Sequence, residues 1–268
     1  KEEKMMKKIL TTACFFLLMF AGTAAAVTIG DTVEVSILTD DGNYLPLYAH
    51  KIQPALKKVY AEAVKGDYYR IIIRNKLNRR IGVVVAVDGR NIISGKKSWL
   101  KSDERMYILE PYATGEYAGW RTAQDKINRF YFTDVADSYA AAFGDESAMG
   151  VIAVAVYPET QYEPCRDFSC WLSGKSERKI QKDGAAAPAM QPRAYESAGT
   201  GYGREEYSPS YQVAFNPEKK KAESILIKYE WRKTLCDLKI INCCEPPRYS
   251  HNRIWDNDGF APPPPCRR

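Results

Sequence analysis

The chain has 268 residues, 45% of them apolar and 27% charged, which is typical of a globular protein and excludes a wholly disordered chain or one with several membrane spans. The net charge of +6 is mild for this length, and because nucleic-acid-binding proteins concentrate positive charge, we expect no nucleic-acid partner. Only two histidines are present, which argues against His-based catalytic triads and His-rich metal sites.

The N-terminal region has the pattern of a secretory signal peptide. Two lysines precede an apolar stretch over residues 9–20, and Ala24 and Ala26 supply the small residues that signal peptidase accepts. The stretch is too short to span a membrane comfortably, although an N-terminal anchor is the alternative. We therefore expect residues 1–26 to be a signal peptide cleaved before Val27, which leaves an exported, periplasmic or extracellular chain without a membrane span.

Short β-type runs separated by turn residues dominate the next part of the chain. Their spacing predicts a mainly β fold, an antiparallel β-sandwich over residues 27–160. Val83 to Val87 is apolar without alternation, which predicts a central strand buried on both faces. The strands are predicted at 33–38, 69–74, 81–87, 105–110, 115–121, 128–133 and 150–157.

Two segments favour helix instead. Residues 54–64 place apolar side chains at helical spacing, and Pro54 occupies a tolerated first-turn position. Residues 135–143 are rich in alanine and predict one or two helical turns. Neither segment is long enough to build a helical domain.

The composition changes after Pro158. Prolines, alanines and the glycine run Gly199 to Gly203 predict a linker or extended loop over 161–203. The glycine run lacks the Lys-Ser/Thr of a phosphate-binding loop, so we interpret it as a flexible turn. Residues 211–215 and 224–231 flank a turn and predict a β-hairpin, within 204–241, that completes the sandwich.

Residues 242–268 form a Pro-rich, cysteine-containing tail that we expect to be irregular and to pack against another surface. An oxidising compartment and an even number of mature cysteines predict up to three disulfides, with connectivity left open. Zinc is the alternative, but the spacing matches no recognised finger, and we expect no metal. The disulfide candidates are Cys165, Cys170, Cys236, Cys243, Cys244 and Cys266.

Seven segments resemble landmarks of an uncharacterised group of exported bacterial proteins. The resemblance covers roughly residues 66–241 and implies that the C-terminal strands belong with the first β block; it implies no activity. The segments are VDGRNIISG (87–95), GWR (119–121), RFYF (129–132), DSYA (137–140), GVIAVAV (150–156), GTGYG (199–203) and KYEWR (228–232).

Catalytic chemistry has little support in the sequence. Carboxylates are abundant, but the spacing of Glu110, Glu116, Asp134 and Asp137 singles out no pair for glycoside hydrolysis. No nucleophile elbow is present. We therefore expect no catalytic residue and no cofactor.

Two features are compatible with binding. Trp99, Trp120 and Tyr117 are candidate aromatics for stacking on sugars, although aromatics also fill cores. A basic turn between two predicted strands is a candidate anion site, the alternative being a solvated hairpin end. Its residues are Arg74, Lys76, Arg79 and Arg80.

These observations favour a non-enzymatic exported protein with a structural or interaction role, whose partner is another protein or a second copy. A carbohydrate-binding module and a carboxylate-dependent hydrolase are the alternatives.

Overall fold

The computed structural model describes residues 26–161 and 197–243, which form a mainly β fold with two seven-stranded sheets. The first sheet contains β1 (Val33–Thr39), β4 (Tyr68–Asn75), β8 (Thr114–Tyr117), β9 (Gly119–Arg121), β10 (Lys126–Asp134), β12 (Ala198–Thr200) and β13 (Glu205–Tyr207). The second contains β2 (Leu47–Gln53), β3 (Leu56–Ala63), β5 (Ile81–Val87), β6 (Arg90–Asn91), β7 (Tyr107–Leu109), β11 (Val151–Pro158) and β14 (Glu223–Trp231). The short helices are the 3₁₀ turns η1 (Val135–Asp137) and η2 (Ala141–Phe143), and α2 (Arg232–Asp237).

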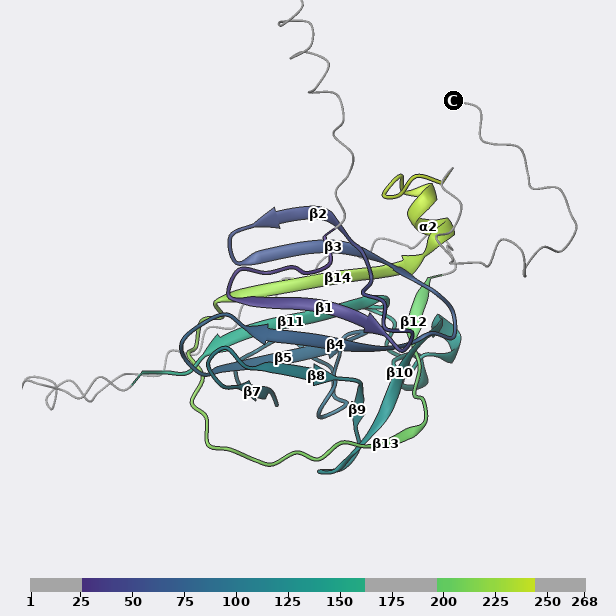
Figure 1. The fold of residues 1–268 in the computed structure, drawn as a ribbon. Helices are drawn as coiled ribbons and strands as arrows, with labels where there is room; N and C mark the ends of the chain where they lie inside the picture. The colour runs from purple at the N-terminus through teal and green to yellow at the C-terminus, as the bar shows by residue number, and fades with distance from the viewer. Residues whose placement is uncertain (1–25, 162–196, 244–268) are drawn as a thin grey trace, which may run out of the picture.

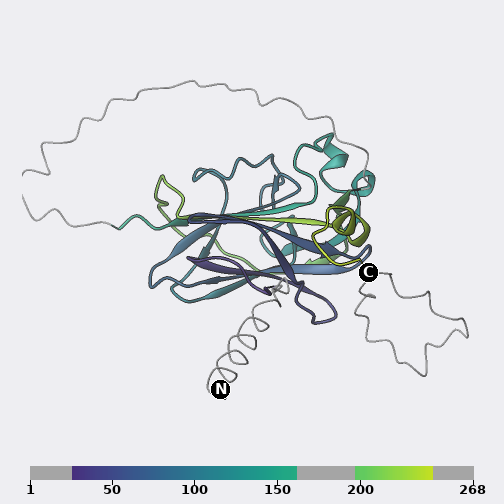
Figure 2. The same ribbon diagram turned by 90° about the horizontal axis from the view of Figure 1, so that it is seen from above.

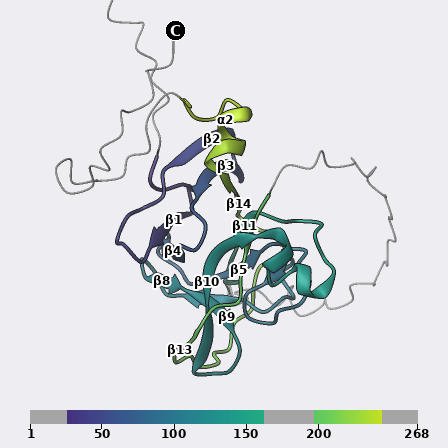
Figure 3. The ribbon, with the colours of Figure 1, turned by 90° about the vertical axis from the view of Figure 1, so that its right-hand side faces the viewer.

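The strand order runs β1-β4-β10-β12 in the first sheet and β2-β3-β14-β11-β5-β6 in the second. The pairs along these paths are antiparallel except β3 with β14, which is parallel. Figure 3 shows α2 beside β2 and β3 at one end of the molecule, with β9, β10 and β13 toward the other.

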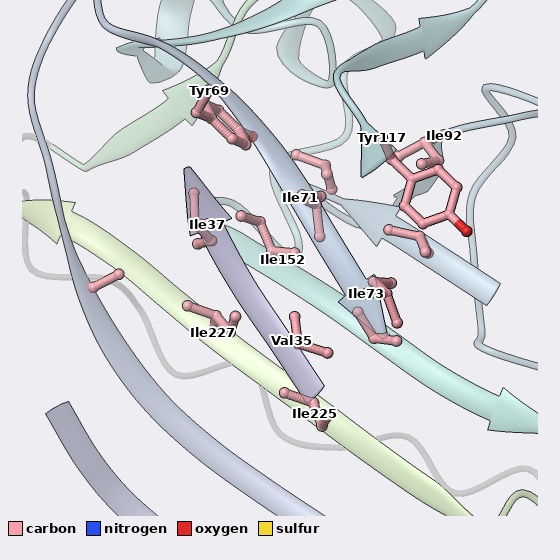
Figure 4. Close-up of a cluster of buried hydrophobic side chains, with 14 of the residues drawn as sticks. Val35, Ile37, Tyr69, Ile71, Ile73, Ile92, Tyr117, Ile152, Ile225 and Ile227 are labelled. Carbon is pink, nitrogen blue, oxygen red and sulfur yellow. The ribbon is translucent and has the colours of Figure 1, made fainter. Parts of the chain in front are cut away.

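The two sheets lie over one another with the apolar core between them (Figures 1 and 2). Alternate residues of β1 and β4 point inward and are fully buried, because side chains alternate between the faces of a strand. Each such side chain contributes about 1.5–3 kcal/mol through burial. Figure 4 shows Val35, Ile37, Ile71 and Ile73 from these strands beside Ile152, Ile225 and Ile227 of β11 and β14.

The prediction that residues 81–87 form a central strand is confirmed. All seven residues of β5 are buried, and the strand lies between β11 and β6. Val83, Val85 and Val87 join the core between the sheets. Val84 faces the other way, where Leu100 and other residues cover it, so both faces of β5 are excluded from water.

The predicted helix at 54–64 is wrong. The segment forms strand β3, in which Lys57, Val59, Ala61 and Ala63 are buried in strict alternation. The amine of Lys57 contacts the carboxylate of Asp31 at 2.6 Å, so the buried charge is paired. Pairing with β2 and β14 determines the conformation, because tertiary contacts override weak helix propensity.

The predicted hairpin within 204–241 is also wrong. Residues 211–215 form no strand, and β14 pairs with β3 and β11 instead. The buried carboxylate of Glu223 accepts hydrogen bonds from the backbone N–H groups of Asp31 and Thr32 at 2.8–3.1 Å. Thus β14 lies in the middle of the second sheet and is tied to the start of the described chain.

The end of the predicted linker, residues 198–200, is strand β12 of the first sheet. Residues 1–25 of the predicted signal peptide, residues 162–196 of the predicted linker and residues 244–268 of the predicted tail lie outside the described residues. Within the described ranges, no helix has the length and apolar character needed to cross a membrane.

Substitutions at adjacent positions test the strand at 56–63. Val59→Asp should lower the free energy of unfolding by about 3 kcal/mol or more, because it buries an unpaired charge. Tyr60→Asp lies on the opposite, half-buried face, where the ring contacts His50, and should cost about 1–2 kcal/mol. Denaturant unfolding measures both; equal losses would contradict the alternation, because a helix places both residues on one face.

Candidate functional site

A buried carboxylate lies at the turn that follows β5. Asp88 and Gly89 both have positive φ, as expected for the tight Asp-Gly turn, and Asp88 is fully buried. Its Oδ1 accepts hydrogen bonds from the Gly150 N–H at 2.7 Å and the Tyr229 hydroxyl at 2.6 Å. Its Oδ2 accepts one from the Thr200 N–H at 2.7 Å. The carboxylate therefore joins three distant segments of the chain.

The network continues through two hydroxyls. The Thr200 Oγ1 lies 2.6 Å from the Tyr229 hydroxyl oxygen and 2.8 Å from that of Tyr69. One arrangement of the hydroxyl protons satisfies every group. In it the Tyr69 hydroxyl donates to Thr200, the Thr200 hydroxyl donates to Tyr229, and the Tyr229 hydroxyl donates to Asp88. Tyr69 and Thr200 belong to the first sheet and Tyr229 to the second, so this polar chain crosses the apolar core.

Burial dominates the electrostatics of this network. Burial raises the pKa of Asp88 to about 6, against the opposing effect of the hydrogen bonds from Tyr229, Thr200 and Gly150. Burial also raises the pKa of Tyr69 and of Tyr229 well above the ordinary tyrosine value. Because these groups are shielded from solvent, we assign the network a structural role: it holds β12, β14 and the start of β11 in place.

The glycine run at 199–203 is not the flexible turn that we predicted. A methyl group on Gly201 would lie 2.2–2.4 Å from ring carbons of Tyr131, and one on Gly199 would lie 2.8 Å from Ser138 Cβ. The Trp120 indole N–H donates to the Gly201 carbonyl at 3.1 Å. Glycine is therefore required here because aromatic side chains pack directly on the backbone.

An exposed group of rings lies above this packed strand. The Tyr139 N–H donates to the Thr200 carbonyl at 2.9 Å, and its ring stacks on that of Tyr202 with centroids 5.4 Å apart. Phe143 contacts Tyr139 edge-on at 5.0 Å, and the buried Trp120 supports Tyr139 from below at 4.4 Å. Phe143 is 57% exposed and Tyr202 is 46% exposed. We call Tyr139, Phe143 and Tyr202 the aromatic surface.

Arg90 supports one edge of the aromatic surface. The central carbon of its guanidinium lies 4.0 Å from the centroid of the Phe143 ring, within cation–π range. Its Nη1 donates to the Gly95 carbonyl at 2.6 Å, and the side chain is largely buried. These contacts hold Phe143 at the edge of the surface beside Tyr139.

The structure corrects two of the three predicted sugar-binding aromatics. Trp120 is 2% exposed and Tyr117 is 7% exposed, because both point into the core from the first sheet (Tyr117 is labelled in Figure 4). Neither can present a ring face to a ligand. Trp99 is 68% exposed, and the Lys97 amine lies 5.5 Å from the centroid of its ring.

The predicted anion-binding turn connects β4 and β5, and its arginines are paired with carboxylates. The Lys76 amine contacts the Gly30 carbonyl at 3.4 Å. Internal pairing compensates most of the positive charge that an anionic ligand would need. The pairs are Arg74 with Glu34 at 3.9 Å, Arg79 with Glu218 at 2.9 Å, and Arg80 with Glu110 and Glu159 at 3.1 and 3.0 Å.

Three of the four carboxylates considered for hydrolysis have separate basic partners. Glu110 pairs with Arg80, Glu116 pairs with Arg70, and Asp134 pairs with Lys65. In the part of the chain that the structure describes, no cluster of three or more His, Cys, Asp or Glu residues is arranged to hold a metal.

Only two of the six disulfide candidates fall within the described residues. Cys236 is half-buried and Cys243 is exposed, and both are free thiols in this structure. Cys165, Cys170, Cys244 and Cys266 lie outside the described residues.

The segments that carry the resemblance supply most of this site. Asp88, Trp120, Tyr139, Thr200 and Tyr229 each belong to one of them and are linked by the contacts above. Comparison of the chain with protein-family models, with curated proteins and with solved structures finds no match.

The raised pKa of Asp88 predicts a pH-dependent stability. Between about pH 4 and 6 the folded chain keeps a proton that the unfolded chain has released, so the free energy of unfolding falls as pH rises through this window. The shift from 3.8 to about 6 corresponds to about 3 kcal/mol in total. Denaturant unfolding of wild type and Asp88→Asn across this window should give a flatter profile for the variant.

Asp137→Asn is the matched control, since Asp137 is an exposed carboxylate near the same site. It should keep the wild-type slope. An Asp88→Asn profile parallel to wild type would contradict the assignment of the titration to Asp88.

Proposed function

We propose that this chain is an exported, non-catalytic interaction protein that binds a protein partner through the aromatic surface. The observation that carries the proposal is the pair of exposed rings, Phe143 and Tyr202, held on both sides of Tyr139. Large rings with few rotatable bonds lose little entropy on binding and are enriched at the energetic centres of protein interfaces.

The rigidity of the aromatic surface supports this role. Tyr139 is fixed by its backbone hydrogen bond to Thr200, and Thr200 is fixed by Asp88. Arg90 fixes the position of Phe143 through the cation–π contact. A binding surface that is ordered before the partner arrives avoids the entropic cost of ordering it on binding.

The framework fits the same role. The two sheets with the core between them support a β-sandwich, a framework that presents its binding residues in connecting segments. Phe143 and Tyr202 both lie in such segments, one at the end of η2 and one just after β12. The signal-peptide pattern at 1–26 supports export.

Glycan binding at Trp99 is the second candidate. Its indole is more exposed than the rings of the aromatic surface, and the Lys97 amine beside it is a donor for sugar hydroxyls. A glycan array that binds the wild type and loses signal with Trp99→Ala would favour this function over the first.

Photo-crosslinking in cells that export the chain tests the primary proposal. A photoreactive phenylalanine analogue at position 143 should give an adduct of discrete mass, and Tyr202→Ala should reduce its yield about tenfold because one ring of the interface is lost. The melting temperature of the Tyr202→Ala chain should stay close to wild type, since Tyr202 is half-exposed.

The control places the same analogue at Tyr211, which is 83% exposed and follows β13, outside the aromatic surface. It should give no discrete adduct. Equal adducts at positions 143 and 211, or no adduct at 143, would contradict the proposal.

A further inference from the structure

The end of the described chain contains a short helix, α2, that is anchored to the core. Leu235 of α2 is fully buried, and the Arg232 guanidinium contacts the Glu62 carboxylate of β3 at 2.9 Å. The helix follows β14, the central strand of the second sheet, without an intervening loop. Cys236 therefore projects from a helix that is anchored to the core.

The chain reverses direction directly after this helix. Lys239 adopts the left-handed conformation with φ 58°, and its N–H donates to the Cys236 carbonyl at 2.9 Å. The Ile240 N–H donates to the Leu235 carbonyl at 2.9 Å. These two bonds form a Schellman motif, which ends the helix and turns the following residues back along it.

The reversal brings a second thiol back to the first. Cys243 lies seven positions after Cys236, and its thiol is a close enough neighbour to raise the pKa of the Cys236 thiol. The Cys243 thiol itself donates to the Ile241 carbonyl at 3.8 Å, within the same reversed segment. Cys236 is half-buried while Cys243 is exposed, so only one member of the pair is fully open to a reagent in solution. Cys244, the next residue, lies outside the described residues.

We propose that Cys236 and Cys243 form an intramolecular disulfide that closes residues 236–243 into a ring. The reaction consumes one molecule of a disulfide oxidant. The exposed Cys243 thiolate attacks that disulfide and releases one thiol, and the Cys236 sulfur then attacks the mixed disulfide at Cys243 and releases the second. Two protein thiols are oxidised, one disulfide is reduced to two thiols, and the protons of the protein thiols are transferred to the products.

The environments of the two thiols fix the order of these steps. The pKa of Cys236 is raised to about 11, mainly by burial and to a smaller extent by the neighbouring Cys243 thiol. The thiolate is the reactive form, so Cys236 is a poor first nucleophile and acts once the mixed disulfide is placed beside it. The ring then holds the chain at 243 against α2, which fixes the point from which residue 244 departs. This pairing is independent of the aromatic surface.

Peptide mapping after oxidation in vitro tests the proposal with the full chain. Reduced, purified protein is treated with oxidised glutathione, alkylated and digested with trypsin without reduction. Trypsin cleaves after Lys239, so the disulfide is detected as peptide 234–239 joined to peptide 240–248. Because Cys244 lies in the same peptide, the variants Cys244→Ser and Cys243→Ser distinguish the two possible partners.

The Cys244→Ser chain should keep the joined peptides, and the Cys243→Ser chain should lose them. Loss of the link in Cys244→Ser, or its retention at wild-type yield in Cys243→Ser, would identify Cys244 as the partner and overturn the proposal. Recovery of Cys236 as a free thiol in oxidised wild type would also overturn it. A different result would count against export of the chain: Cys236 and Cys243 are reduced in protein isolated from cells, yet the same protein forms the disulfide in vitro.

Discussion

Burial of the Asp88 carboxylate is the constraint on which the arrangement of the two sheets depends. A carboxylate without water is stable in a protein only when donors surround it, and the donors come from residues 150, 200 and 229. These residues are separated from Asp88 by 62, 112 and 141 positions. Apolar packing alone tolerates small shifts of one sheet over the other, whereas a hydrogen-bonded carboxylate permits one arrangement.

The same constraint extends outward to the surface. Thr200 donates its N–H to Asp88 and accepts a hydrogen bond from Tyr139 through its carbonyl. The glycines on either side of Thr200 let Ser138 and Tyr131 pack on the strand backbone. Tyr139 in the aromatic surface is therefore connected to the buried Asp88 through one residue, Thr200. This connection makes the aromatic surface rigid.

Local pattern was sufficient to predict most strands. β1, β4, β5, β10, β11 and β14 have β-branched runs or clear alternation, and each was placed within a few residues. β3 was misassigned because Leu56, Val59, Tyr60 and Ala63 have helical spacing, while its buried face includes Lys57. The parallel partner that stabilises β3, residues 223–231, is too far along the chain to influence a local prediction.

The candidate site was harder to predict than the fold. Asp88 has the sequence of an ordinary Asp-Gly turn, and only its distant donors distinguish it from a solvated one. Trp120 and Tyr117 were considered as exposed rings, although their strands place them in the core. The segments on which the resemblance was based include Asp88, Thr200 and Tyr229, but the segments do not indicate which side chains meet.

Amide hydrogen exchange in Tyr229→Phe is the most direct measurement of whether the network positions the aromatic surface. The change removes one hydroxyl, which donates to Asp88 and contacts Thr200, and leaves the buried ring in place. The amides of Gly150, Thr200 and Tyr139 should exchange faster than in wild type, while those between β1 and β4 keep their protection. Unchanged exchange at Thr200 and Tyr139, or a uniform rise across both sheets, would contradict this role for Asp88.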